Sequence, residues 1–407
     1  MTPRSTTGWK VRLGCALVIG LAAAGCASTT LPPATRSPSG LALEEDERRI
    51  WNRAGEEQEK LRRAHVEYDD PALKGYVNAV AQRVAPAEVA QAGIALDVRV
   101  IKNPALNAFM YPNGTMYVHT GILARMENEA QLATLLAHEM THATHRHAVR
   151  QFRDMRNKAD FMAGLSVATL PFGSLGLLAN LLGSLGMVAA VYGYSQDLER
   201  EADAEGFQLM VRAGYDPREA PKLFRHLKQW VEDEDKPEPF FFNTHPRLAE
   251  RIASYEDLIA RNPQFLSRPE PLRIGEEAFL AHTRRMIFDD ALLDLSAGRF
   301  LQAQKGFQKV LGLDPENARA NFFMAETYRS QNDPKLFAEA TWLYQRAIAL
   351  DPTYADPHKG LGTLHYQARQ SAEAAAEFQQ YLQLAPVAAD RGHIQSLIES
   401  LQKEVQK

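Results

Sequence analysis

The segment "LLAHEMTHATHRHAVR" (residues 135–150) decides the fold, because it reads as one helix that carries four histidines and a glutamate. His138 and His142 are four residues apart, so both imidazoles project from one helix face and can reach a single ion. Glu139 is turned by about 100° from His138 and is therefore not a third ligand on that stripe. The pattern H-E-x-x-H on a helix predicts a zinc site with two imidazole ligands and a glutamate general base.

This helix cannot complete the site, because a catalytic zinc takes three protein ligands and keeps one open position. Metzincins place a further histidine ten residues after the first and a glycine three residues before it. Those positions hold Ala148 and His145 here, which excludes that class and requires a third ligand from elsewhere in the chain. We expect His145 and His147 to be solvated or hydrogen-bonded histidines and not ligands.

A second helical stretch, "YSQDLEREADAEGFQLMVRAGY" (194–215), is rich in acidic residues. Glu199 and Asp203 are four residues apart and share a helix face, whereas Glu201 points away. Alone, such a stretch is a solvated acidic face. With two histidines lacking a carboxylate partner, the better interpretation is a glutamate ligand plus an aspartate that accepts the outer N–H of a ligating histidine.

Three motifs in this order, HEMTH (138–142), EREAD (199–203) and THPRLAERI (244–252), resemble the Ste-type, HtpX-like family of metallopeptidases. The segments 69–84 and 107–123 are similar to the family's N-terminal helix and active-site strands, so the resemblance covers roughly residues 45–260. The resemblance implies one zinc ion per chain, held by His138, His142 and Glu199, with Glu139 as general base, Asp203 behind the ligands, and His245 and Arg251 beside the metal.

The resemblance leaves two roles open for His245. Pro246 suits a first helical position, which would place His245 at the cap of the helix that carries Arg251. As a donor, His245 or Arg251 would stabilise the oxyanion of the transition state. As a fourth ligand, His245 would instead keep the resting site closed.

The N-terminus predicts export. A basic start and a short apolar core are typical of a signal peptide over residues 1–25. Cys26 follows small residues, as in a bacterial lipoprotein box, although Ala23 stands where leucine is usual, so a plain signal peptide or an uncleaved anchor stays open. Residues 26–42 form a Pro-, Ser- and Thr-rich flexible tether. We expect a periplasmic protein attached to the outer membrane by a lipid on Cys26, because Ala27 and not aspartate follows it.

Residues 43–270 are predicted to form an α+β zincin-like metalloprotease domain, mostly helical with a small sheet. It begins with a charged amphipathic helix over 43–67, followed by a strand in 94–101 and a hairpin around Asn113 and Gly114. The nearly uncharged segment 161–193 is broken by Pro and Gly, which favours a buried helical hairpin, with membrane insertion and a substrate lid as alternatives.

Residues 283–407 are predicted to form an all-α solenoid. The motifs "LDPEN", "LDPTY" and "LAPVA" place prolines at 315, 352 and 386, and the second spacing, 34 residues, is the tetratricopeptide period. Residues 332–335 would lengthen the first spacing. Three repeats over 283–388 would precede a capping helix over 389–406, with small residues such as Gly360 and Gly362 where helices approach closely.

Composition excludes one class of function. A formal charge of −4 and the absence of a basic tract beyond residue 40 give no footprint for nucleic acid.

A protease of this family joined to such repeats behind a lipoprotein-like signal resembles periplasmic proteases that support outer-membrane β-barrel assembly. We therefore expect an endopeptidase that degrades misfolded or stalled envelope proteins, with the repeats contacting the β-barrel assembly machinery. The alternative is a non-proteolytic scaffold or chaperone with a vestigial zinc site.

Overall fold

The computed structural model describes residues 31–34, 43–157, 194–232, 248–267 and 269–406. Over these ranges the chain is mostly helical, with one three-stranded sheet in its first half, followed by helices alone. This confirms the predicted fold class. The elements are α1 (Glu45–Arg63), α2 (Pro71–Val84), α3 (Glu88–Gln91), β1 (Asp97–Ile101), β2 (Ala108–Met110), β3 (Thr115–His119), α4 (Thr120–Arg125), α5 (Glu129–Thr144), α6 (His147–Asn157), α10 (Gln196–Arg212), α11 (Glu219–Glu232), α13 (Leu248–Arg261), η3 (Pro263–Phe265), α14 (Glu276–Ser296), α15 (Phe300–Leu313), α16 (Ala318–Ser330), η4 (Pro334–Leu336), α17 (Phe337–Leu350), α18 (Asp356–Gln367), α19 (Ser371–Leu384) and α20 (Arg391–Val405).

The sheet has the strand order β1-β3-β2, with β1 parallel and β2 antiparallel to β3. The predicted strand in 94–101 and the predicted hairpin are both confirmed. Gly114 closes the hairpin with φ +101°, a conformation that side-chain-bearing residues rarely adopt. A Cβ at Gly114 would also lie 2.5 Å from the carbonyl oxygen of Ala95, so the turn requires glycine for two reasons.

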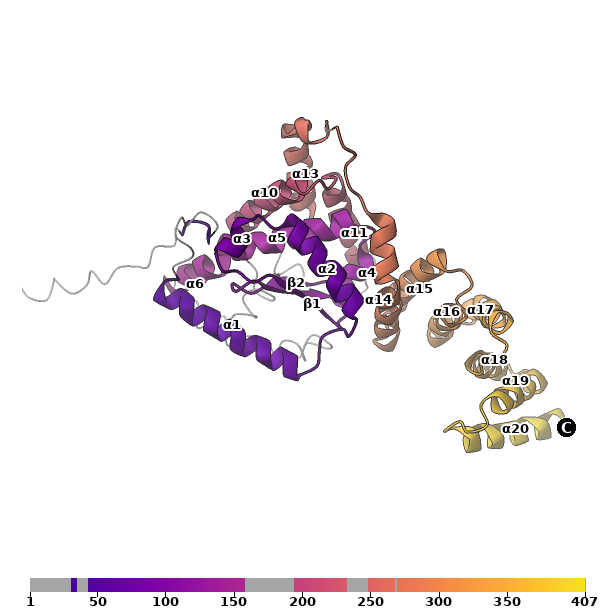
Figure 1. Ribbon diagram of the computed structural model, residues 1–407. Helices are drawn as coiled ribbons and strands as arrows, with labels where there is room; N and C mark the ends of the chain where they lie inside the picture. The colour runs from indigo at the N-terminus through magenta and orange to yellow at the C-terminus, as the bar shows by residue number, and fades with distance from the viewer. Residues whose placement is uncertain (1–30, 35–42, 158–193, 233–247, 268, 407) are drawn as a thin grey trace, which may run out of the picture.

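Both faces of the sheet are covered, and Figure 1 shows α1 on the side opposite α2. One face packs against α2 and α5 and gives the main hydrophobic core Val98, Val100, Met116 and Val118. The other face forms a separate cluster in which Ile101, Phe109, Tyr111 and Tyr117 meet Ile50, Ala54 and Leu61 of α1. The amphipathic helix predicted over 43–67 is therefore confirmed, and its apolar stripe covers the second face.

Every residue of α5, the helix with the H-E-x-x-H motif, is buried. Its start is fixed by the Asn128 side chain, which caps the helix by accepting from the Gln131 amide at 3.0 Å. Buried Glu129 then accepts from Tyr76 at 2.9 Å and from Tyr215 at 2.8 Å. These contacts tie the start of α5 to α2 and to the segment after α10.

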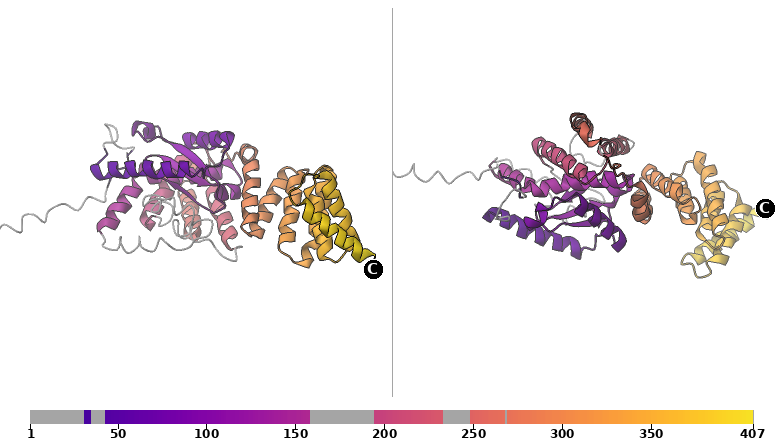
Figure 2. Two further views of the ribbon diagram at one scale, coloured as in Figure 1. Left: turned by 90° about the horizontal axis from the view of Figure 1, so that it is seen from below. Right: turned by 45° about the horizontal axis from the view of Figure 1, so that its top comes forward.

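The helices from α14 onward stack as antiparallel hairpins, α14 with α15, α16 with α17 and α18 with α19, and α20 packs on α19. Figures 1 and 2 show them extending from one side of the sheet-containing region. A Cβ at Gly362 would lie 2.7 Å from the Phe378 ring, so this glycine allows close helix approach, as predicted. The turn before α17 holds Asn332 at φ +52° and the short η4 helix, which accounts for the longer first spacing.

The first of these hairpins is built into the main core. Its buried members there are Phe279, Met286, Ile287 and Val310. Arg125, at the end of α4, is buried and forms ion pairs with Asp290 and with Asp294, the second at 2.8 Å. The hairpin α14–α15 therefore shares its apolar contacts and its buried charges with the sheet-containing region.

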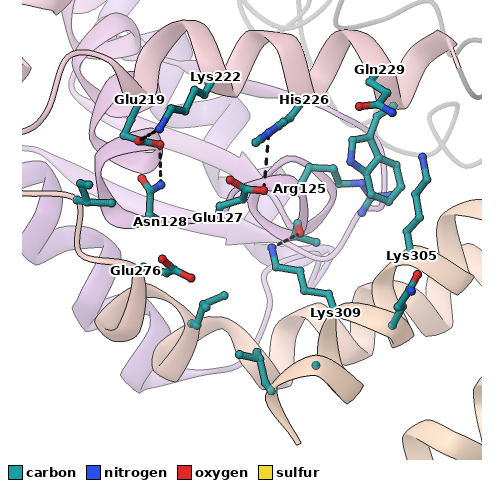
Figure 3. Close-up of a pocket in the computed structure, with 17 residues that line it drawn as sticks. Arg125, Glu127, Asn128, Glu219, Lys222, His226, Gln229, Glu276, Lys305 and Lys309 are labelled. Atoms are coloured by element: carbon teal, nitrogen blue, oxygen red, sulfur yellow. Dashed lines mark hydrogen bonds and ion pairs between the residues drawn. The ribbon is translucent and has the colours of Figure 1, made fainter. Parts of the chain in front are cut away.

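A cleft of about 840 Å³ lies between α11, the end of α4 and this hairpin (Figure 3). Trp230 is contacted by two cations there, Arg125 and Lys305, each 4.5 Å from the ring centroid. Lys309 donates to the carbonyl oxygen of Ala124 at 2.9 Å and so caps the end of α4. Burial lowers the pKa of Lys309 to about 8.

Several predictions concern residues outside the described ranges. These are the signal segment 1–25, the lipidation site Cys26 and the segment 161–193. Within the ranges that the structure does describe, none of the helices combines the length and the apolar character that crossing a membrane requires.

Candidate metal centre

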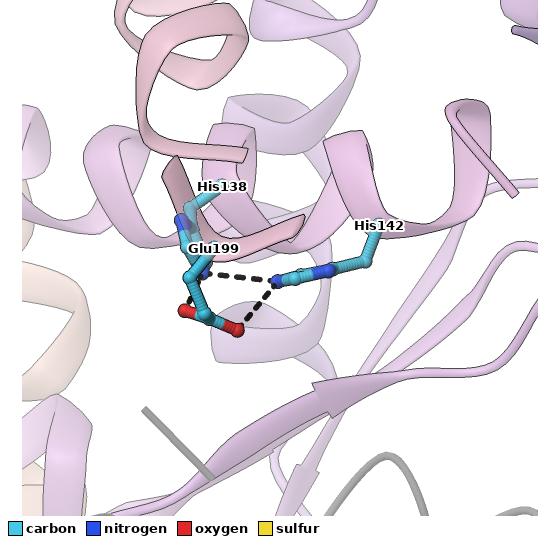
Figure 4. A group of neighbouring side chains, drawn as sticks. All are labelled: His138, His142 and Glu199. Carbon is cyan, nitrogen blue, oxygen red and sulfur yellow. Dashed lines mark hydrogen bonds and ion pairs between the residues drawn. The ribbon is translucent and has the colours of Figure 1, made fainter. Parts of the chain in front are cut away.

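Two helices bring three potential metal ligands together (Figure 4). His138 and His142 project from α5 with their Nε2 atoms 3.1 Å apart. Glu199, from α10, places one carboxylate oxygen 3.5 Å from each of these nitrogen atoms. All three residues are buried, and this is the only such cluster among the residues that the structure describes.

The spacing of these atoms fits a metal ion. Zinc bonds of about 2.0–2.2 Å in tetrahedral geometry separate neighbouring ligand atoms by about 3.3–3.6 Å. Two unprotonated Nε2 atoms at 3.1 Å would repel each other, and either a shared proton or a metal ion between them removes this repulsion. Two imidazoles and one carboxylate are also the donor set of catalytic zinc sites, which leave a fourth position open.

The outer nitrogen of His138 meets a buried ion pair. Its Nδ1 atom lies 2.9 Å from Asp203, which comes from the same helix as Glu199. Asp203 in turn accepts from Arg251 at 2.6 Å. A carboxylate at this position accepts the Nδ1 proton and leaves the Nε2 lone pair of His138 directed at the ion, as hypothesised from the sequence for Asp203.

Arg251 occupies a different place from the one expected. Its guanidinium donates to Asp203 through Nε and Nη2 and lies 2.9 Å from His138 Nδ1. The same group stacks over the Phe224 ring at 4.1 Å. Arg251 thus lies on the side of His138 that faces away from His142 and Glu199. This position makes it a support for Asp203 and corrects the expectation of an oxyanion donor beside the metal.

The electrostatics of the centre favour positive charge. Burial and the Arg251 charge lower the pKa of His138, but hydrogen bonds to Asp203 and Glu199 outweigh them and raise this pKa to about 9. Burial raises the pKa of Asp203, yet the charge of Arg251 and the bond to His138 bring it below the usual value. Asp203 therefore stays ionised, and the space between the Nε2 atoms attracts a proton or a metal ion.

Glu139 follows His138 in the chain and is buried, with 2% of its surface exposed. Tyr194, just before α10, stacks on the His142 ring with centroids 4.0 Å apart and planes 15° apart. Burial raises the pKa of Tyr194, and the charges of Glu139 and Glu199 raise it further. Sequence reasoning did not identify Tyr194, because no spacing rule links a tyrosine just before one helix to a histidine on another helix.

Two further histidines, His145 and His245, were singled out in the sequence. His145 is half-buried at the C-terminal end of α5, where its Nδ1 lies 3.1 Å from the Thr144 hydroxyl, as expected for a hydrogen-bonded histidine. His245 lies outside the described residues.

Comparisons with known proteins agree with this geometry. Residues 71–259 match the model of Peptidase family M48. The Beta-barrel assembly-enhancing protease of Escherichia coli is 27% identical over 283 residues, which cover 61% of this chain and 57% of that protein. The mitochondrial metalloendopeptidase OMA1 of Schizosaccharomyces pombe is 30% identical over 205 residues, covering 49% of this chain and 59% of the relative. The aligned part thus spans less than two thirds of either relative.

Proposed function

We propose that this chain, whose residues 71–259 match the model of Peptidase family M48, is a zinc-dependent endopeptidase of the bacterial cell envelope. The observation that carries the proposal is the convergence of His138, His142 and Glu199 in a buried cluster, with buried Glu139 adjacent to His138 in the chain. A structural zinc site would use four protein ligands, whereas the residues that the structure describes supply three, the number found in catalytic sites.

His138, His142 and Glu199 would hold the ion, which when bound polarises the scissile carbonyl and makes a water molecule more acidic. Glu139 accepts the proton of the attacking water and delivers it to the leaving amine. Asp203 holds the Nδ1 proton of His138, and so keeps the Nε2 lone pair available as a ligand.

The substrates that we propose are misfolded or stalled outer-membrane polypeptides. Three features support this: the signal-like N-terminus, the likeness to a protease named for β-barrel assembly, and the stacked repeats, which offer an extended surface for clients or for the assembly machinery. The edge strand β2 lies beside α5. An extended polypeptide that pairs with such an edge is held by main-chain bonds, which suits unfolded clients of varied sequence.

Zinc content and casein cleavage, measured on the purified wild type and on Glu139→Gln, test the proposal. We expect the variant to keep about one zinc ion per chain, because the ligands are unchanged, and to lose about 10²- to 10⁴-fold in cleavage rate. Glu205→Gln, the same substitution on the half-buried side of α10, is the matched control and should cleave like the wild type.

Equal cleavage by wild type and Glu139→Gln would contradict the assignment of the base. A wild type that neither binds zinc nor cleaves casein would instead favour the scaffold or chaperone alternative.

A further inference from the structure

The outer nitrogen of the second histidine, His142, meets another histidine. His142 Nδ1 lies 2.9 Å from Nδ1 of His147, and the two rings meet edge to face with centroids 4.9 Å apart. His147 is the first residue of α6 and is fully buried. The chain reaches this position by a tight turn at Arg146, which has φ +56°. The turn thus directs His147 back toward the helix that it has just left.

Two charged residues, Glu201 and Arg150, lie beyond His147. Together with His142 and His147 they form a row of neighbouring side chains. The Nε2 atom of His147 lies 3.5 Å from the carboxylate of Glu201, which is longer than a well-formed hydrogen bond. Arg150 donates to the same carboxylate oxygen at 2.8 Å. Glu201 and Arg150 are only partly buried, with 33% and 24% of their side chains exposed. The row therefore runs from the buried centre on α5 through α6 to the rim of α10.

The proton positions along this row follow from the metal site. A metal ion at His142 Nε2 needs the lone pair of that atom, so the neutral ring carries its proton on Nδ1. Two ring nitrogens 2.9 Å apart form a hydrogen bond only if one donates and the other accepts, so His147 Nδ1 is the acceptor. The proton of His147 then lies on Nε2, and it faces the Glu201 carboxylate.

We propose that His147, supported by Glu201 and Arg150, is a positioning residue for the metal, because it fixes the tautomer and ring orientation of His142. The inference rests on the proposed zinc site. In this arrangement the outer nitrogen, Nδ1, of each ligating histidine donates to an acceptor, and each acceptor is linked to an acid that pairs with an arginine. For His138 the acceptor is the carboxylate of Asp203 itself, and for His142 an imidazole stands between the ligand and Glu201.

Packing alone is the competing explanation, since Tyr194 contacts both rings, with centroids 4.0 Å from His142 and 6.0 Å from His147. Two substitutions separate the explanations. His147→Phe keeps a ring but removes the acceptor, whereas His147→Asn loses the ring but can place its side-chain oxygen where Nδ1 was. The ligand set itself is unchanged in both variants.

The experiment measures zinc affinity of the full-length chain by competition with a chromophoric chelator, and the visible spectrum of the cobalt-substituted protein. We expect His147→Phe to weaken zinc binding by about 10- to 100-fold and to shift the cobalt spectrum, and His147→Asn to stay within about threefold of wild type. His145→Phe, two residues away, is the control and should bind zinc like the wild type. Melting temperatures of the metal-free proteins show whether each variant is folded.

Wild-type zinc affinity and cobalt spectrum in His147→Phe would overturn the inference, as would an equal loss in His147→Asn. If His147→Phe does not fold, Glu201→Gln decides: we expect a loss of several-fold, and an unchanged affinity would overturn the inference. A wild type that binds no zinc would overturn the proposed function itself. That outcome differs from one in which the wild type binds zinc and the variants match it.

Discussion

Gly206 offers a sharp test of how the centre is assembled, because it lies where α10 crosses the backbone of α5. A Cβ added at Gly206 would lie 3.0 Å from the amide nitrogen of His138, 3.1 Å from its Cα and 3.2 Å from the carbonyl carbon of Ala137. Comfortable contacts between such atoms are about 3.5–4.0 Å. These neighbours are backbone atoms that cannot rotate away, so Gly206→Ala must separate the two helices by about 0.5 Å.

The separation affects stability and metal binding differently. Overpacking of this kind costs about 1–3 kcal/mol, and the better helix propensity of alanine returns about 1 kcal/mol. The net loss of unfolding free energy should therefore be at most about 2 kcal/mol. Metal ligation tolerates displacements of only about 0.2 Å, and α10 carries Glu199 and Asp203 while α5 carries both histidines. We expect zinc affinity to fall by about tenfold or more.

Zinc affinity by chelator competition and urea unfolding of the metal-free chain measure the two effects. Gly55→Ala is the matched control, since Gly55 lies inside α1, is exposed and has no atom within 4 Å of an added Cβ. This control should gain about 1 kcal/mol of stability and bind zinc like the wild type. Wild-type zinc affinity in Gly206→Ala would show that the approach of α10 to α5 does not set the ligand geometry, and would refute the reasoning.

Three further predictions follow from named contacts. Asp203→Ala should weaken zinc binding by about 10- to 100-fold in chelator competition, and lower the unfolding free energy by about 3–5 kcal/mol in urea, because it removes the carboxylate that pairs with buried Arg251. Burial lowers the pKa of His119 from 6.5 to about 4, so the unfolded chain binds the proton first as the pH falls. His119 should therefore lower the unfolding free energy by about 1.4 kcal/mol per pH unit as the pH falls between those two values. In urea unfolding, the loss of unfolding free energy from pH 7 to pH 5 should be smaller for His119→Phe than for the wild type. A chain ending at residue 330 should still hydrolyse a short peptide, whereas one ending at residue 282 should not fold, because α14 and α15 supply core residues. Circular dichroism measures whether each shortened chain folds, and a peptide assay measures its hydrolysis.

The elements of the fold that the sequence predicted are those set by local pattern. The spacing of His138 and His142 gives one helix face, and the structure places both side chains toward Glu199. Likewise, Asn113 and Gly114 between two apolar runs predicted the hairpin, because only a residue that tolerates positive φ closes it. Such features depend on neighbours within a few residues, which a single sequence displays directly.

The features that the sequence did not predict depend on where helices cross. Periodicity gives the face of a residue but not the distance to the next helix, so nothing indicated that Arg251 lies behind His138 and not beside the ion. The close approach at Gly206 was invisible for the same reason. The packing of α14 into the main core was also missed, because a repeat period describes the contacts between hairpins and not those of the first hairpin with its neighbour.

The three acids of the motif EREAD show why spacing matters more here than acidic composition. Glu199 and Asp203 face α5, one toward both Nε2 atoms and the other toward the outer nitrogen of His138. Glu201 points away from that face, as predicted, yet it faces α6 and pairs there with His147 and Arg150. A shift of Glu201 by one position would rotate it by about 100° around α10 and break its contact with His147, while leaving the other two acids in place. The alternation of acids at 199, 201 and 203 is therefore what lets one helix contact both histidines of the candidate site, His138 directly and His142 through His147.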